Sequence, residues 1–269
     1  MSRAPVAAFV ALVIATVAAF FVTQHLKVTT PLVQGRPAPF PHTINPVYGG
    51  SCPHRNGKGK VKLVSYKRMI ISFYLQNRSD EVSVYIVDRD RDVVRQIANN
   101  VFMRAHPPKR HYFTWNGRLA DGSIAPAGTY YVKVSLFHEA RSLVISNSTA
   151  ALPVTVETTR PHVRVTGVTP ATITSGTSAP ATIRYTGTGS LRPRILIYRV
   201  RAGRALRLVK SYNATSRSGR SLWDGTLTGG RPAPRGRYVV GVRVTDLACT
   251  TATSPVTPAA APRAVVTVG

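Results

Sequence analysis

The sequence predicts an all-β fold in which two tandem β-sandwich domains follow one N-terminal transmembrane helix. Three observations lead to this prediction. The 20 glycines and 20 prolines are interspersed with Val, Thr, Ile and Tyr, a composition typical of short strands joined by turns. One motif occurs twice, 108 positions apart. The first 27 residues contain a long stretch without a charged side chain. The 269 residues are also enough for two domains, each with its own core.

The N-terminal segment, residues 1–27, has the length and composition of a transmembrane anchor. Ala4–Thr23 is a run of 20 residues without a charge, which is enough to cross a hydrocarbon core as a helix. A cleaved signal peptide is the alternative, with Val17–Ala19 as the cleavage site, but the apolar run continues beyond it through Phe20–Val22. We therefore expect an uncleaved single-pass anchor in the cell membrane, with the C-terminal domains on the extracytoplasmic side.

Residues 28–60 are expected to form a stalk between the membrane and the first domain. This segment is rich in proline, and proline-rich segments are extended and semi-rigid. The prolines that support this prediction are Pro31, Pro37, Pro39, Pro41 and Pro46. A small cationic loop at His54–Lys62 overlaps the end of this segment, and for it the alternatives are contact with headgroups or wall polymer and an ordinary solvated surface.

An internal repeat locates the two domains. In each copy a Trp is followed by a Gly two positions on, then by Pro at +11, Gly at +13 and Tyr at +15. The Trp ends a strand, and Asn-Gly or Asp-Gly then turns the chain, so that we expect a hairpin with the Trp and Tyr rings in the core. The repeated residues are Trp115, Gly117, Pro126, Gly128 and Tyr130 in the first copy and Trp223, Gly225, Pro234, Gly236 and Tyr238 in the second.

Strand patterns upstream of each motif extend the repeat. They lie at Met69–Leu75 and Glu81–Val87 in the first copy and at Ala181–Tyr185 and Ile195–Val200 in the second. Pro161 is suitably placed to begin a new domain after the strand at Val154–Val156. The predicted domains are therefore residues 61–157 and 158–269.

The repeated motif, W-[DN]-G followed by P-x-G-x-Y-x-V, resembles the Ig-like domain of the flagellar hook-capping protein FlgD, a module of bacterial surface and secreted proteins. The resemblance covers most of the chain beyond the stalk and implies two antiparallel Ig-like sandwiches, each FlgD-like. It also implies an architectural role, because that family brings no catalytic residues. The N-terminal anchor, the tandem arrangement and the basic charge differ from a hook-capping protein and favour a general module of the cell envelope.

The chain is strongly basic, with 36 Lys and Arg against 10 Asp and Glu. Such a charge attracts anionic partners in general, including cell-wall polymers, lipid headgroups and nucleic acid, although a solvated basic surface is an equal alternative. Residues 158–269 carry 17 basic and 2 acidic residues, and 16 of the 17 are Arg, whose planar group suits phosphate and carboxylate. The candidate anion-binding residues are Arg192, Arg194, Arg199 and Arg201.

The two cysteines, Cys52 and Cys249, could form a disulfide outside the cytoplasm if the two domains meet, or could remain two free thiols. Their spacing is not that of a metal or redox pair. No metal, cofactor or catalytic residue is predicted. Asp88, Asp90 and Asp92 resemble the start of a calcium loop, but Val93 and Asn99 replace its Gly and Glu, so that a polar hairpin tip is expected.

These observations favour a non-enzymatic structural or binding protein of the bacterial cell envelope, in which tandem Ig-like domains contact another protein or an anionic wall polymer. Nucleic acid is an unexpected partner, since no basic motif interleaved with aromatic residues is present, and no small-molecule substrate is expected. Two alternatives stay open. One is a basic surface protein that binds an anionic polymer or nucleic acid, and the other is an accessory module of a cell-wall enzyme system.

Overall fold

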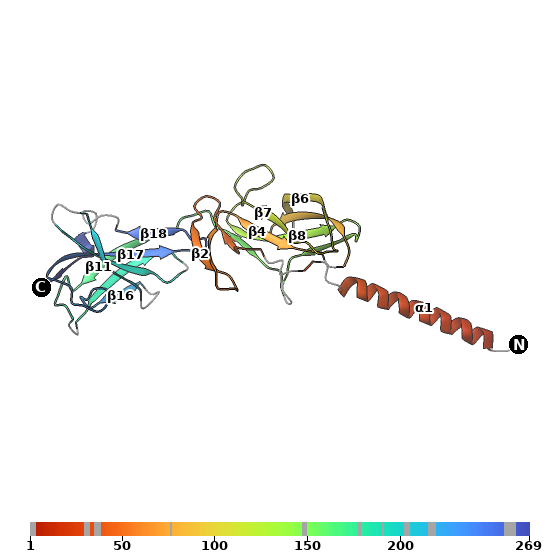
Figure 1. Cartoon of the computed structure of the whole chain (residues 1–269), viewed down its shortest axis with the longest axis horizontal. Coiled ribbons are helices and arrows are strands. Elements are labelled where there is room, and N and C mark those ends of the chain that lie inside the picture. The colour runs from red at the N-terminus through yellow and green to blue at the C-terminus, as the bar shows by residue number, and fades with distance from the viewer. Residues whose placement is uncertain are drawn as a thin grey trace.

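The computed structural model describes residues 4–29, 33–34, 39–75, 77–146, 150–176, 179–189, 191–201, 205–214, 219–255 and 262–269, with the side chains of its long helix described over residues 8–23. The α-helix α1 (Ala4–Thr29) and two groups of strands follow one another along the long axis (Figure 1), with a short 3-10 helix, η2 (Pro262–Ala264), near the C-terminus. The two termini lie at opposite ends of this axis. Most of the described chain is strand, as the composition predicts.

Helix α1 presents apolar side chains to its surroundings. Phe9, Leu12 and Phe21 are each about two-thirds exposed. In the part of the chain that the structure describes, no helix was found to be long and apolar enough to span a membrane. Residues 1–3 of the predicted anchor, and the side chains of residues 4–7 and 24–27, lie outside the described part.

The first group of strands, which we call the first unit, encloses its core between two sheets. Alternation along the strands produces this core: in β8 the inward positions Tyr130, Val132 and Val134 are buried and their neighbours are partly exposed. The larger sheet has six strands in the order β1-β10-β8-β5-β6, with β9 also paired to β8, and the smaller pairs β4 with β7. The strands are β1 (Thr43–Ile44), β4 (Met69–Phe73), β5 (Asp80–Val87), β6 (Val93–Met103), β7 (His111–Trp115), β8 (Gly128–Leu136), β9 (Arg141–Val144) and β10 (Val154–Val156).

The second unit repeats the strand order of the larger sheet, and its smaller sheet has one more strand, β11, than that of the first unit. Its larger sheet has the order β12-β19-β17-β14-β15, with β18 also paired to β17, and its smaller sheet has the order β11-β13-β16. A separate core of buried side chains lies between the two sheets, and it includes Ile183, Ile197 and Val240. The strands are β11 (Val163–Thr169), β12 (Thr172–Ile173), β13 (Ala181–Gly187), β14 (Arg194–Arg199), β15 (Arg207–Asn213), β16 (Arg220–Trp223), β17 (Gly236–Thr245), β18 (Thr251–Ser254) and β19 (Val265–Val268).

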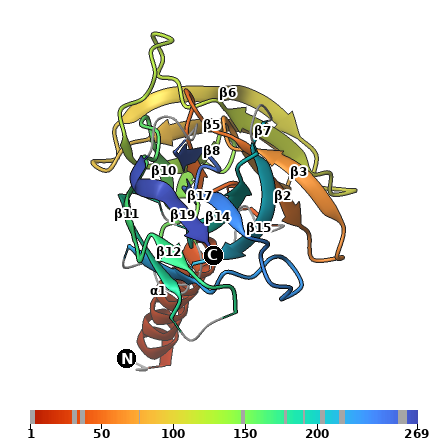
Figure 2. The ribbon, with the colours of Figure 1, turned by 90° about the vertical axis from the view of Figure 1, so that its left-hand side faces the viewer.

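One element of the first unit has no counterpart in the second. Between β1 and β4, the strands β2 (Ser51–Arg55) and β3 (Val61–Ser65) form a separate two-stranded hairpin. Figure 2, which views the molecule along its length, shows this hairpin beside the main sheets, and in Figure 1 β2 lies between the two units. The equivalent segment of the second unit, between β12 and β13, contains no strand among its described residues.

The structure corrects the extent of the predicted stalk. Thr43 and Ile44 pair in parallel with Thr155 and Val156, so that this part of residues 28–60 belongs to the larger sheet of the first unit. Ile44 is fully buried there. The proline pattern did not reveal this because a two-residue strand carries almost no periodicity of its own. Two of the prolines, Pro31 and Pro37, lie outside the described residues.

A buried carboxylate ties two turns of the first unit together. Asp80 has no exposed surface, and its side chain accepts hydrogen bonds from the backbone N–H groups of Glu81, His138 and Glu139 and contacts the His138 Nδ1 at 3.0 Å. Burial raises the pKa of this carboxyl, but the bonds from His138, Glu139 and Glu81 outweigh burial, so that the pKa lies below its ordinary value. Asp80 therefore joins the start of β5 to the chain after β8.

Candidate functional site

The Trp motif of the first unit connects its two sheets across the core. Trp115 ends β7 in the smaller sheet, and Tyr130 lies in β8 of the larger one. Their ring centroids are 5.3 Å apart in an edge-to-face arrangement. The indole N–H of Trp115 donates to the carbonyl of Arg118 at 2.8 Å, and the hydroxyl of Tyr130 donates to the carbonyl of Pro126 at 3.0 Å. Both polar groups of the buried rings are therefore satisfied within the motif.

The second unit reproduces this geometry. Trp223 and Tyr238 have ring centroids 5.3 Å apart, the Trp223 N–H donates to the carbonyl of Thr226 at 2.8 Å, and the Tyr238 hydroxyl donates to the carbonyl of Pro234 at 2.7 Å. The hairpin predicted for this motif is wrong, because the strands on either side of it belong to different sheets. The large rings explain this arrangement, since a Trp and a Tyr on opposite sheets can fill the space between them.

The repeated glycines serve backbone geometry. Gly117 and Gly225 have φ values of 70° and 74°, which glycine adopts without steric cost. A Cβ atom on Gly117 would also overlap Pro46, and one on Gly225 would lie 2.9 Å from the Cα of Ser175. The other two repeated glycines, Gly128 and Gly236, are the first residues of β8 and β17. The motif residues thus build the core and its turns.

The junction between the two units contains a disulfide. Cys52 in β2 is bonded to Cys249, which lies between β17 and β18, and their Cα atoms are 6.1 Å apart. The two residues are 197 positions apart in the sequence. Cys249 has a φ of 59°, and it lies in a turn that is closed by the bond from the N–H of Thr250 to the side chain of Asp246 at 2.7 Å. The hairpin β2–β3 thus reaches from the first unit to a turn of the second.

Hydrogen bonds surround this disulfide. The N–H of Gly50 donates to the carbonyl of Ala248 at 3.0 Å, and the hydroxyl of Thr250 donates to the carbonyl of Tyr48 at 3.0 Å. No side chain larger than hydrogen fits at position 50, because a Cβ atom there would overlap the carbonyl of Cys249. The junction is therefore a close backbone contact as well as a covalent one.

The segment that links the two units also takes part in the junction. The side-chain amide of Asn45 donates to the carbonyl of Thr159 at 2.8 Å, and the guanidinium of Arg160 lies 4.3 Å from the centre of the Tyr48 ring. A small cavity of about 150 Å³ opens beside this linker, and Glu157 and Asp246 both line it. Burial, and secondarily the charge of Asp246, raise the pKa of the Glu157 carboxyl.

The four candidate anion-binding arginines do not form one cluster. Arg192 and Arg194 are exposed at the beginning of β14, where Arg194 donates to the hydroxyl of Ser211 at 2.8 Å. Arg199 ends the same strand, about 17 Å away at the usual rise per residue, and Arg201 follows it. These last two line a cavity together with Arg207, which the sequence prediction missed. Arg207 lies opposite Arg199 because β14 pairs with β15, and this pairing could not be predicted from the sequence.

With this geometry established, the comparison with known proteins concerns mainly the first unit. Residues 62–138 match the FlgD Ig-like domain. One curated relative is the "Basal-body rod modification protein FlgD" of Escherichia coli (strain K12), which is 39% identical over 70 residues. This match covers 26% of the present chain and 29% of that protein, so that the chain spans less than a third of its length.

Among solved structures, the chain is similar to the crystal structure of dimeric latent PorU from Porphyromonas gingivalis. The similarity covers 90% of this chain and 21% of that one, with 10% identity and a TM-score of 0.29. The FlgD match therefore bears on the fold more directly. It includes β4–β8 and the complete Trp motif of the first unit, so that this part of the β-sandwich is similar to the FlgD Ig-like domain. The second unit, which shares the topology and the motif, lies outside the matched residues.

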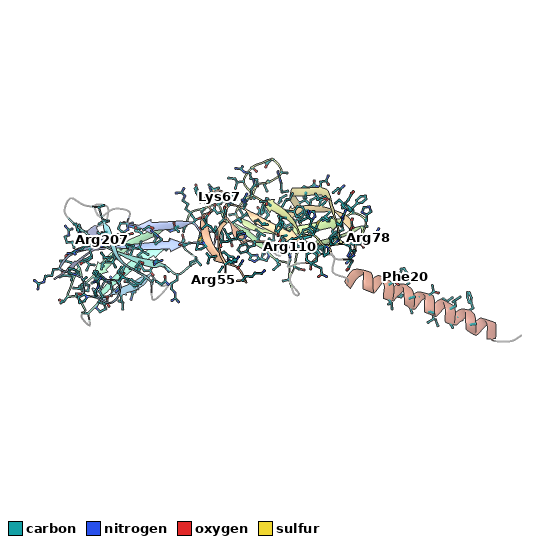
Figure 3. The ribbon with its side chains drawn as sticks, viewed as in Figure 1. Phe20, Arg55, Lys67, Arg78, Arg110 and Arg207 are labelled. Atoms are coloured by element: carbon teal, nitrogen blue, oxygen red, sulfur yellow. A yellow bond between two sulfur atoms is a disulfide. The ribbon has the colours of Figure 1, made fainter. Side chains whose placement is uncertain are left out.

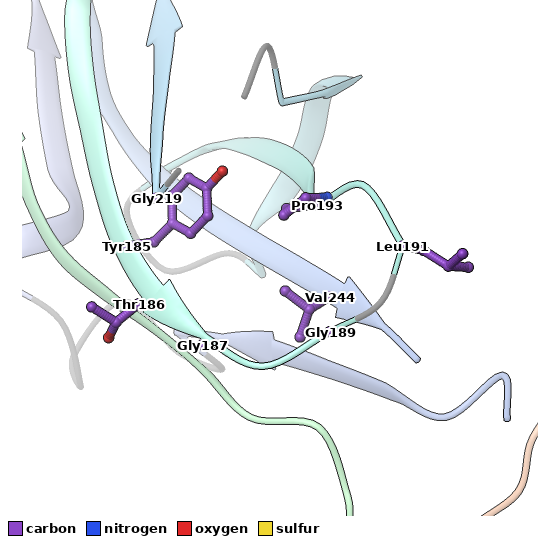
Figure 4. Close-up of a pocket in the computed structure, with 8 residues that line it drawn as sticks. All are labelled: Tyr185, Thr186, Gly187, Gly189, Leu191, Pro193, Gly219 and Val244. Carbon is purple, nitrogen blue, oxygen red and sulfur yellow. The ribbon is translucent and has the colours of Figure 1, made fainter. Parts of the chain in front are cut away.

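A second cavity of the second unit has no charged residue in its described lining. It has a volume of about 320 Å³, and Figure 4 shows Tyr185, Pro193 and Val244 around it. Glycine and uncharged side chains make up the whole described lining.

Within the described residues, no group of three or more His, Cys, Asp or Glu is arranged to hold a metal ion. The side chain of Asp88 instead accepts the N–H groups of Asp90 and Asp92, which closes the polar turn between β5 and β6.

Proposed function

We propose that this protein is a non-enzymatic structural protein of the bacterial cell envelope, in which two Ig-like sandwiches form one rigid spacer anchored to the membrane by α1. The junction between the units is the observation that carries the proposal. A disulfide, a backbone hydrogen bond and a side-chain hydrogen bond join the same two segments, 48–52 and 248–250. Two sandwiches held in this way keep a fixed orientation, which suits a spacer or a surface for protein contact.

The FlgD-type match supports a structural or protein-contact role for the first sandwich. The same strand order and the same Trp–Tyr contact in the second unit support assigning it to the same module. The disulfide supports an extracytoplasmic location, because structural disulfides persist in oxidising compartments. The proposed contacts are with another envelope protein or an anionic wall polymer, and Figure 3 shows labelled basic side chains such as Arg55, Arg110 and Arg207 on both units.

Two features of α1 support membrane anchoring. Most of its exposed side chains between residues 8 and 23 are apolar, and Phe20 projects from the helix in Figure 3. The only two side-chain hydroxyls between residues 8 and 23 bond within the helix: Thr16 donates to the carbonyl of Leu12 at 2.9 Å and Thr23 to that of Ala19 at 2.7 Å. A lipid environment requires polar groups to be satisfied in this manner.

Orientation is tested by protease protection of a tag placed after Gly269. We expect cleavage in cells whose outer layers have been permeabilised and protection in inverted membrane vesicles. Recovery of the tagged protein in the soluble fraction would exclude the anchor. Cleavage confined to inverted vesicles would place the β units in the cytoplasm and exclude the envelope role.

Rigidity is tested by hydrogen–deuterium exchange of the full chain in detergent. The Gly50 amide, which bonds across the junction, should exchange slowly in the oxidised protein and much faster in the double variant Cys52→Ser/Cys249→Ser. Peptides from the core strand β5 should exchange equally in both proteins and provide the internal control. Rapid exchange of Gly50 in the oxidised protein would contradict a rigid junction.

A further inference from the structure

A cavity of about 300 Å³ lies at the end of the second unit, where β14 ends and β15 begins. Arg199 and Arg207 face each other directly across these antiparallel strands, and Arg201 and Arg231 line the same cavity. Like charges at directly opposite positions of a sheet destabilise it. Arg199 and Arg207 therefore repel each other unless an anion lies between them, and Arg201 and Arg231 add to the positive charge at this cavity.

No carboxylate of the second unit offsets this charge. Residues 158–269 contain two acids, Asp224 and Asp246. Asp224 forms a salt bridge of 3.2 Å with Lys210, and Asp246 closes the turn next to the disulfide at the opposite end of β17. Among the described residues, none of the four arginines has a salt-bridge partner. An external anion is the remaining source of negative charge.

The first unit shows that the shared fold does not itself require this charge. In the second unit Arg199 pairs with Tyr238, whereas in the first the pairing of β5 with β8 ends at Val87 opposite Tyr131, so that Asp88 follows opposite Tyr130. The charges act on the two tyrosines accordingly: burial raises both hydroxyl pKa values, Asp88 raises that of Tyr130 further, and Arg199 opposes the rise at Tyr238. Equivalent positions thus carry an acid in one unit and an arginine in the other.

The rest of the described lining offers an anion no further side-chain hydrogen-bond donor. The described walls between the arginines are largely apolar, with Val209, Leu227 and Pro234 among them. The Tyr238 hydroxyl and the Thr228 hydroxyl are both occupied by backbone carbonyls, at 2.7 and 3.1 Å. The arginines are therefore the groups left to bind a ligand.

We propose that this arginine cavity binds a phosphate group, with Arg199 and Arg207 as its principal ligands and Arg201 and Arg231 completing the site. A carboxylate carries one charge and two oxygens, which a single guanidinium can satisfy in bidentate fashion. A phosphate monoester carries up to two charges and three terminal oxygens, and it can accept bonds from several guanidiniums at once. The site does not depend on the proposed anchoring or spacer role.

The test is calorimetric titration of the full chain in a neutral detergent with inorganic phosphate at constant ionic strength. The double variant Arg199→Gln/Arg207→Gln should bind about tenfold more weakly or worse, because each residue supplies at least one charge-assisted hydrogen bond. The matched control is Arg192→Gln/Arg194→Gln, which removes the same charge from the other end of β14 and should change the affinity by less than about twofold. Thermal unfolding verifies that each variant folds. If Arg199→Gln/Arg207→Gln does not fold, the single variant Arg231→Gln is used in its place.

Two further ligands make the test specific. Malonate tests the anion class, and binding of malonate as tightly as phosphate would overturn the assignment. Dimethyl phosphate carries one charge and two free oxygens, as a carboxylate does, so it should bind more weakly than inorganic phosphate, which would indicate a free or terminal phosphate as the ligand. Binding of dimethyl phosphate as tightly as inorganic phosphate would show that the second charge and the third oxygen are not recognised and would overturn the assignment. An equal loss of affinity in both double variants, or no binding by the unaltered protein at about 10 mM phosphate, would refute it.

Discussion

Replacing Trp115 by Phe should destabilise the first unit while leaving the second unchanged. Trp115 is only 1% exposed, and its N–H bond to Arg118 is lost in the variant, which costs about 1 kcal/mol. Phe is smaller by roughly 40 Å³, and at about 24 cal/mol per Å³ the cavity costs about 1 kcal/mol more. The expected loss of about 2 kcal/mol in the free energy of unfolding lowers the thermal unfolding midpoint of a domain of this size by roughly 10 °C.

The two tryptophans of the chain make this effect separable by unit. After Trp115→Phe, Trp223 is the only indole left, so that intrinsic fluorescence reports the second unit alone. Differential scanning calorimetry of the full chain should show one transition shifted down, while the fluorescence transition keeps its unaltered midpoint. The reciprocal control is Trp223→Phe, which loses an equivalent bond of 2.8 Å and an equivalent ring contact of 5.3 Å.

The reasoning depends on the two cores unfolding independently, since each is a separate cluster of buried residues. If the Trp223 fluorescence transition shifted together with the calorimetric one in Trp115→Phe, the junction would couple the units into one cooperative structure. A shift of less than about 2 °C in both measurements would instead show that the bond and the packing of the indole contribute little.

Two further predictions concern pH. Asp80→Asn should destabilise the first unit by about 2 kcal/mol near neutral pH, because the asparagine side chain has one acceptor oxygen and cannot accept all the hydrogen bonds that the carboxylate accepts. Since the folded pKa of Asp80 lies below its ordinary 3.8, the carboxylate stabilises above that value and the stabilisation disappears as the pH falls through the folded pKa. Denaturant unfolding near pH 7 and in acid should therefore show a difference that shrinks in acid; a constant difference would contradict it. The pKa of Glu157 in the folded protein is raised above its ordinary value of 4.5. The protonated side chain therefore favours folding at low pH, and this contribution to stability is lost as the pH rises from 4.5 through the pKa of the folded protein. Glu157→Gln should melt no lower than the unaltered protein at neutral pH, and a clearly lower midpoint would show that the carboxylate is needed.

Periodicity and the internal repeat predicted much of the fold. The expected strands at Met69–Leu75 and Ala181–Tyr185 correspond to β4 and β13, because alternating apolar residues over five or more positions leave one face to bury. Trp and Tyr were expected in the core for their size, and Trp115, Trp223 and Tyr238 are among the largest fully buried side chains of the described chain.

The pairing of strands was beyond the reach of the same patterns. The Trp motif was expected to be a hairpin, since Asn-Gly and Asp-Gly turns commonly join adjacent strands. The strands on either side instead belong to opposite sheets. Local turn chemistry is compatible with both arrangements, and only the packing of the Trp and Tyr rings across the core distinguishes them.

What the sequence by itself determined was therefore the local and periodic part of the molecule: an all-β chain, two copies of one motif, and a basic second half with few acids. The tertiary structure decided which distant residues meet. It brought the hairpin that carries Cys52 against the turn that carries Cys249, and it placed Arg207 opposite Arg199 while separating Arg199 from Arg194. The physical reason is that these contacts depend on sheet register and on the packing of one unit against the other, and neither leaves a short-range signal in the sequence.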